Sequence, residues 1–381
     1  MRYCYYFIFI IAIFLLVGCQ AEQPTEKPTP TTEKAVNIPL RYATNFTVEK
    51  IGKNTLLHIK SPWKDAAEGK QYLLYPKDSP TPKGYPNATK IGVPVSRIIC
   101  TSTVDIAFLD ALGASDKIVA ISNGSYVYNP TIRTALAEQK IVEIGGNNTI
   151  DYERALTTNP DLAFIYSINA KNDYQKFEEL GIPTVFMSDF MEKTPLGRTE
   201  WLYFVAHFVG LEQQAALLLD TIQMDYNRIK SMAQMAPERP TVLTGAVYEG
   251  TWYVAGGKSL MAQLIADAGG NYLWADNTEL SGVPLDFEAV YPKALTANIW
   301  INMFSYTKQK DLLASDSRYQ EFTAVKNGRV YNYFKRATPE GGSDMFESAI
   351  VHPEILLQDL NLIFSKIAPQ PTALYYYQEV D

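Results

Sequence analysis

The chain has 381 residues, 47% of them hydrophobic, and a formal net charge of −7. This length allows a buried core in two domains, whereas the acidic balance argues against nucleic acid, whose binding requires clustered lysine and arginine. Three histidines and three cysteines are few for a disulfide framework or a bare zinc or manganese site, so we expect neither a metal site nor a cofactor.

The first residues have the features of an export signal. Arg2 precedes an apolar run over residues 5–17 that is too short to span a bilayer comfortably. The run ends in Leu16-Val17-Gly18-Cys19, which resembles a bacterial lipobox. That resemblance implies a signal peptide over residues 1–18 and a lipid on Cys19. A plain secretory signal with an incidental cysteine is the alternative.

The next two segments differ in composition. Residues 19–38 are rich in Pro, Thr, Glu, Gln and Lys and offer almost nothing to bury, so we expect a disordered tether. Residues 39–91 contain runs of strand-forming residues at 46–50, 55–60 and 72–75, separated by turn residues. This pattern predicts a small β-ribbon of two or three strands.

The remainder alternates between strand and helix patterns. Over residues 92–194, short β-branched runs alternate with helical stretches, which predicts a parallel sheet flanked by helices. Residues 195–238 form a helical linker in this interpretation, and its second helix, from about residue 212 to 235, spans roughly 35 Å. The alternation resumes over residues 239–381. The expected fold class is α/β, with two Rossmann-like lobes, a rigid inter-lobe helix and a small N-terminal β-ribbon extension.

The two halves share a short pattern. Asp151-Tyr152-Glu153 precedes a helix and then a β-branched strand, and Asp286-Phe287-Glu288 does the same in the second half. This repetition indicates two related lobes.

The ordered set of motifs is similar to one family, the iron-chelate and cobalamin group of ABC-transporter solute-binding proteins. The matching stretches are residues 97–102, 108–114, 117–121, 151–162, 180–185, 250–260, 266–273 and 326–331. They extend over about residues 92–366. The family's two lobes are joined by a rigid helix, as expected above.

The resemblance implies a function. It implies a lipoprotein of an ABC importer that captures an iron chelate, either a ferric siderophore or haem, and delivers it to a permease dimer with ATPase subunits. Cobalamin on the same fold stays open as the alternative ligand. We expect no enzyme activity and a monomer in the periplasm, anchored by lipid to the inner membrane.

The resemblance also implies residue roles. Two exposed glutamates, one per lobe, would pair with permease arginines, and Glu153 and Glu288 match those positions. The ligand would lie between the lobes, near loops at the carboxyl ends of strands. The candidate ligand-binding residues, mostly aromatic, are Tyr126, Tyr128, Tyr166, Trp252, Tyr253, Met303, Tyr306, Arg336 and Phe346. Aromatic faces would suit a macrocycle or aromatic chelate, and Arg336 would suit an anionic ligand.

Two other classes remain open. An exported α/β hydrolase would need a nucleophile and a base that converge, and the shortage of histidine disfavours it. A surface adhesin or accessory lipoprotein is compatible with the β-ribbon. The run Gly256-Gly257-Lys258-Ser259 resembles part of a phosphate-binding loop, but Trp252 stands where the first glycine is required.

Overall fold

The computed structural model describes residues 34–146, 149–166, 173–303, 306–365 and 373–381. The expected signal peptide, Cys19 and most of the expected tether lie outside the described residues. Ala35–Asp381 form one compact unit. Within the described part of the chain, no helix is both long and apolar enough to cross a membrane.

The N-terminal extension is a five-stranded sheet whose strands follow one another in chain order. Its strands are β1 (Val36–Ile38), β2 (Phe46–Ile51), β3 (Asn54–Ile59), β4 (Lys70–Pro76) and β5 (Ala88–Val93). It is larger than the two or three strands expected. The difference comes from β1, which pairs with β2 inside the range expected for the tether, and from β5, which pairs in parallel with β4 inside a Pro-rich segment.

The extension packs against the body of the protein through aromatic rings and two carboxylates. The ring of Phe46 lies 5.1 Å from that of Trp201, and Tyr72 accepts a hydrogen bond from the Phe186 amide. Glu200 accepts the backbone N–H groups of residues 41–43, and Glu192 accepts those of residues 44 and 45. Five consecutive amides are therefore satisfied by two side chains.

The N-terminal lobe is built on a parallel sheet in the order β12-β11-β6-β7-β8. Its strands are β6 (Ile98–Cys100), β7 (Ile118–Ile121), β8 (Val142–Glu143), β11 (Leu162–Ile165) and β12 (Thr184–Phe186). A separate hairpin pairs β9 (Gly145–Gly146) with β10 (Thr149–Ile150). The helices of this lobe are α1 (Thr103–Ala111), α2 (Pro130–Ala137), α3 (Tyr152–Thr157) and α4 (Asp173–Glu179).

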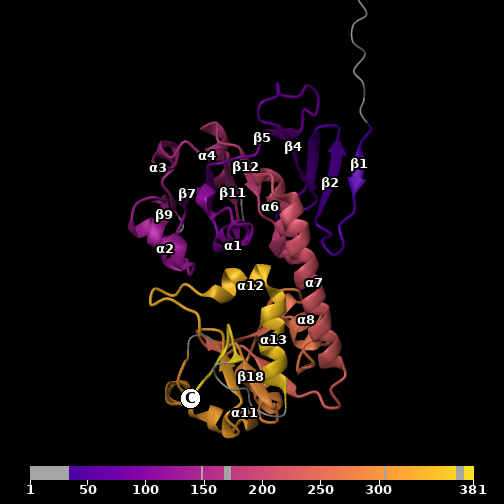
Figure 1. Cartoon of the computed structure of the whole chain (residues 1–381). Helices are drawn as coiled ribbons and strands as arrows, with labels where there is room; N and C mark the ends of the chain where they lie inside the picture. Colours follow the sequence, from indigo (N-terminus) through magenta and orange to yellow (C-terminus); the bar gives the residue numbers. More distant parts are fainter. Residues whose placement is uncertain (1–33, 147–148, 167–172, 304–305, 366–372) are drawn as a thin grey trace, which may run out of the picture. The chain divides into compact units, whose positions relative to one another are not determined.

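Three helices follow the N-terminal lobe: α5 (Pro195–Thr199), α6 (Trp201–Val209) and α7 (Glu212–Gln234). Thr194 caps α5 by accepting the Gly197 amide, as expected for a Thr-Pro start. The prediction of one long helix from about residue 212 is confirmed by α7, which runs past α6 at one end and α13 at the other (Figure 1).

The C-terminal lobe has a second sheet in the order β16-β13-β18-β19-β20, in which only β20 is antiparallel. Its strands are β13 (Thr241–Thr244), β16 (Asn271–Tyr272), β18 (Ile299–Ile301), β19 (Val330–Asn332) and β20 (Gln378–Glu379). An antiparallel sheet of β14 (Val247–Tyr248), β15 (Thr251–Ala255) and β17 (Gly282–Leu285) lies beside it. The helices are α8 (Leu260–Asp267), α9 (Phe287–Ala294), α10 (Gln309–Ser315), α11 (Thr323–Lys326), α12 (Ser348–Val351) and α13 (Pro353–Phe364).

The apolar side chains form two cores. The larger one runs from the extension through the N-terminal lobe and α7 to one face of the C-terminal sheet, where it includes Val242 and Ile301. The smaller one covers the opposite face and is rich in aromatic rings, with Trp252 stacked on Trp300 at 5.5 Å. The prediction of an α/β protein with two lobes is confirmed.

Candidate functional site at the inter-lobe junction

The carboxyl ends of the parallel strands present several of the predicted residues. Tyr126 and Tyr128 follow β7, Tyr166 follows β11, and Arg336 follows β19. Loops at the carboxyl ends of parallel strands lie at one edge of a sheet, which is where α/β proteins bind ligands. These four residues therefore lie in loops of that kind, and their contact with a ligand stays a prediction.

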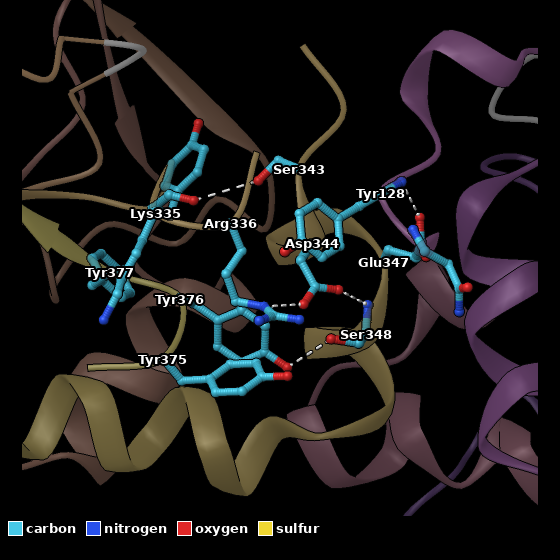
Figure 2. Close-up of polar contacts among 12 residues, drawn as sticks. Tyr128, Lys335, Arg336, Ser343, Asp344, Glu347, Ser348, Tyr375, Tyr376 and Tyr377 are labelled. Carbon is cyan, nitrogen blue, oxygen red and sulfur yellow. Dashed lines mark hydrogen bonds and ion pairs between the residues drawn. The ribbon is translucent and has the colours of Figure 1, made fainter. Parts of the chain in front are cut away.

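Arg336 lies between two tyrosine rings, one from each lobe (Figure 2). Its guanidinium carbon is 4.9 Å from the ring centre of Tyr128 and 4.2 Å from that of Tyr375. Its Nε atom donates to Oδ2 of Asp344 at 2.6 Å, and the side chain is 32% exposed. Among the described residues only Nε of this guanidinium donates a side-chain hydrogen bond, and a partly exposed guanidinium whose other N–H groups can donate suits an anionic group.

The tail of the chain positions one of these rings. The buried carboxylate of Asp359 accepts the amides of Tyr375, Tyr376 and Tyr377 at 2.7–3.0 Å. The hydroxyl of Tyr376 bonds to that of Ser348 at 2.9 Å, and the hydroxyl of Tyr377 donates to Asn302. Burial raises the pKa of the Asp359 carboxyl, while the three amides oppose that shift. Sequence reasoning missed Asp344, Asp359 and Tyr375, although the run of three tyrosines was a possible signal.

A carboxylate joins the two lobes beside Arg336. Oε2 of Glu347 accepts the Tyr128 amide at 2.8 Å (Figure 2). Oε1 of the same carboxylate accepts the Asn129 amide at 2.9 Å. Asn129 is also the N-cap of α2. We call this place the inter-lobe junction, since it joins the β7–α2 loop to the segment that follows β19.

A second polar group lies near Tyr166 in the N-terminal lobe. Arg198 donates to Asp189 at 2.6 Å, and the Tyr166 ring packs edge-on against Phe190. Among the described residues, Asp105 and Asp189 each keep one buried carboxylate oxygen without a hydrogen-bond partner. Burial and the neighbouring Asp189 raise the pKa of Asp105.

Two of the predicted ligand residues are wrong. Trp252 is 0% exposed because it points into the smaller core, where its indole N–H donates to the Thr244 carbonyl. Met303 follows β18 but is also fully buried in that core. Neither side chain is available to a ligand.

The other candidates are accessible to different degrees. Tyr253, next to Trp252, is 44% exposed because alternate residues of a strand face opposite sides, but β15 belongs to the separate antiparallel sheet. Tyr126 is 60% exposed, and Phe346 is 54% exposed with its ring against Tyr333. Tyr306 is half-buried against the smaller core. Within the part of the chain that the structure describes, the ring and ion-pair partners of Arg336 are Tyr128, Tyr375 and Asp344, and none of these four.

The two predicted docking glutamates occupy equivalent positions. Glu153 is the second residue of α3 after its N-cap Asp151, and Glu288 is the second residue of α9 after its N-cap Asp286. Both side chains are exposed. Glu288 lies 3.9 Å from Arg318.

Beside α3 is a polar hollow with a volume of about 360 Å³, lined by Glu143, Ile144, Gly145, Thr149, Ile150, Asp151 and Arg154.

His207 and Cys100 are both buried. His207 Nδ1 lies 3.1 Å from Glu212, and burial lowers the pKa of its imidazole. Cys100 is a free, buried thiol in β6, and burial raises its pKa. Cys19, the expected site of lipid attachment, lies outside the described residues.

Comparison with known proteins adds three findings. Residues 98–337 match a family model described as periplasmic binding protein. A protein of Methanocaldococcus jannaschii described as an uncharacterized lipoprotein is 27% identical over 382 residues, which is 91% of each chain. Two solved structures have the same fold. A periplasmic haem-binding protein of Pseudomonas aeruginosa has a TM-score of 0.58 at 18% identity, covering 75% of this chain and 98% of that one. The periplasmic haem-binding protein RhuT of Roseiflexus sp. RS-1, in apo form, has a TM-score of 0.57 at 19% identity, covering 71% and 98%.

Proposed function

Because the chain belongs to the periplasmic binding protein family, we propose that it is a lipid-anchored periplasmic solute-binding protein that captures an anionic iron chelate, a ferric siderophore or haem, between its lobes. It then delivers the chelate to the permease and ATPase subunits of an ABC importer. Solute-binding proteins of this family bind a substrate for such transporters and are not a class of enzymes.

One observation carries the proposal about the ligand. Arg336 is held by Asp344 and by the rings of Tyr128 and Tyr375, so both lobes contribute to its surroundings. Arginine is permanently charged and planar, and it binds carboxylates and related oxygen anions through parallel N–H groups. Ferric catecholates and haem both carry anionic oxygens beside a flat, apolar body, which suits an arginine between tyrosines.

Glu153 and Glu288 support the proposal about the transporter. They are exposed acids at the same position of two equivalent helices, one in each lobe. We propose that each pairs with a permease arginine. Exposed ion pairs contribute only ~0–1 kcal/mol each, so such pairs would fix orientation and speed association while allowing release. The relative described as a lipoprotein supports an anchor at Cys19.

The test is calorimetric titration with haem, a ferric catecholate, a ferric hydroxamate and cobalamin. We expect binding of one iron chelate, and Arg336→Met should weaken it about 10- to 100-fold, because a charged hydrogen bond is worth ~1.5–3 kcal/mol. Arg336→Lys should retain part of the affinity, since it keeps the charge and loses the planar stacking. Arg228→Met, on the surface of α7, is the matched control.

The outcomes separate the alternatives. Unchanged affinity in Arg336→Met would remove Arg336 from the ligand site. If cobalamin binds and no iron chelate does, the protein is a cobalamin-binding protein, which is the alternative function. Failure to bind all four compounds would overturn the proposed ligand class.

A further inference from the structure

The segment after β19 touches the N-terminal lobe at several points. Besides the two bonds of Glu347, Thr103 donates its hydroxyl to the Phe346 carbonyl at 3.0 Å. Glu340 pairs with Arg133 of α2 at 3.2 Å. These contacts join the two lobes through protein groups alone.

The segment has a defined shape of its own. Residues 337 and 343 form an antiparallel bridge, and the Thr338 amide donates to the Gly342 carbonyl at 2.7 Å. A Cβ atom on Gly342 would lie 2.7 Å from the Tyr126 carbonyl oxygen, so only glycine allows this approach of the two backbones. The segment is therefore a hairpin whose tip rests on the β7–α2 loop.

The helix that follows this segment, α12, is packed firmly against the N-terminal lobe. α12, which directly follows Glu347, packs against α1 and α5, and its Ala349 and Val351 are buried. The Ile350 carbonyl also accepts the Thr199 hydroxyl. α12 is thus held by packing, Glu347 directly precedes it, and Glu340 lies at the tip of the hairpin.

We propose that residues 337–347 form a clasp that holds the two lobes together and must release the β7–α2 loop before a ligand enters or leaves. This inference concerns how a ligand enters and leaves, and it rests on the proposed function, in which the ligand binds between the lobes. Its contacts lie beside Arg336, because the clasp residue Asp344 accepts a hydrogen bond from this guanidinium, and Glu347 accepts the amide of Tyr128, whose ring packs on it.

The environment of Glu347 supports a clasp that opens readily near neutral pH. Its side chain is 2% exposed, and burial raises its pKa to about 7. Asp344 in its own segment and Asp110 on α1 add to this rise, whereas the amides of Tyr128 and Asn129 oppose it. The nearby cations are engaged, Arg336 by Asp344 and Arg133 by Glu340.

The sign of the pH effect follows from linkage. In the released state this carboxyl would titrate near its ordinary value of 4.5. The clasped state then binds the proton more tightly, so protonation favours the clasp. Between those two pKa values the clasp weakens as the pH rises, and above about 7 it becomes independent of pH.

Hydrogen exchange of the full chain, without ligand, tests the clasp directly. After correction for intrinsic rates, the protection of the Tyr128 and Asn129 amides should fall roughly tenfold between pH 6 and pH 8. In Glu347→Gln, which keeps an acceptor without a titrating charge, protection should not depend on pH. In Glu347→Ala, protection should be lost at both pH values. Glu340→Gln is the matched control, since its ion pair is exposed, and it should keep the pH dependence.

The amides of β7 (Ile118–Ile121) should be unchanged in every variant, which reports an intact fold. Equal protection of Tyr128 and Asn129 at pH 6 and pH 8 in the native chain would overturn the clasp, and so would protection of these two amides in Glu347→Ala that matches the native chain. Because no chelate is present, failure of the proposed ligand would leave this result unaffected, and failure of the clasp would leave the titrations unaffected.

Discussion

The two lobes bring different chemistry to their junction. The N-terminal lobe contributes mainly neutral groups, namely the Thr103 hydroxyl, the Tyr128 ring and the amides of Tyr128 and Asn129, with Arg133 as its charged member. The C-terminal lobe contributes the charges of Arg336, Asp344, Glu340 and Glu347. Most of the charge at the junction therefore comes from the C-terminal lobe, while the N-terminal lobe supplies mainly an aromatic ring, a hydroxyl and backbone amides.

The lobes also differ in their cores. The N-terminal lobe shares one core with the extension and α7, so its stability depends on all three. The C-terminal lobe has in addition a separate aromatic core built on Trp252 and Trp300. A change in this smaller core should destabilise one lobe with little effect on the other.

The largest expected effect tests this difference in cores. Trp252→Ala should lower the free energy of unfolding by about 3–5 kcal/mol, because it removes a fully buried indole. Tyr253→Ala, the next residue on the same strand, should cost less than about 1 kcal/mol, since its side chain is largely in solvent. Urea denaturation followed by circular dichroism measures both. Equal costs would show that the smaller core does not support its lobe.

A smaller effect tests how the C-terminal lobe fixes its charges. Asp359→Asn should cost about 1–3 kcal/mol of unfolding free energy, because an amide oxygen replaces a carboxylate that accepts three backbone N–H groups. The tail should loosen and Tyr375 should leave Arg336. Exchange of the amides of residues 375–377 reports this directly, and their unchanged protection would contradict the role given to Asp359.

The smallest effect separates Glu153 from Glu288, the two acids proposed to pair with permease arginines. Glu153→Gln should slow association with the permease by a few fold, and Glu288→Gln by less, because Arg318 lies 3.9 Å from Glu288 and already offsets part of its charge. Association with the permease in lipid nanodiscs at two salt concentrations measures the rates. Asp116→Asn, another exposed acid of the N-terminal lobe, is the control. A larger loss from Glu288→Gln would reverse this ranking.

Patterns along the chain predicted some of these features and missed others for physical reasons. Strand–helix alternation predicted the two lobes, and the residues just after each strand included Tyr128 and Arg336. Met303 also follows a strand, but it is buried in the smaller core, and Trp252 lies within β15 and is buried there too. The strand pattern does not say on which side of a sheet a second core will form. Asp359 and Tyr375 were missed because their roles arise from contacts between distant segments. The strand β5 was missed because prolines flank it.

The attachment of residues 41–45 has a mechanical consequence. A pull on the chain at Ala35 would first load the pairing of β1 with β2, and then the amides gripped by Glu200 and Glu192. Those glutamates flank α5, next to α6, so the force would enter the scaffold of the N-terminal lobe without crossing the hairpin at residues 337–347. Tension applied at Ala35 would therefore leave the contacts between residues 337–347 and the N-terminal lobe undisturbed.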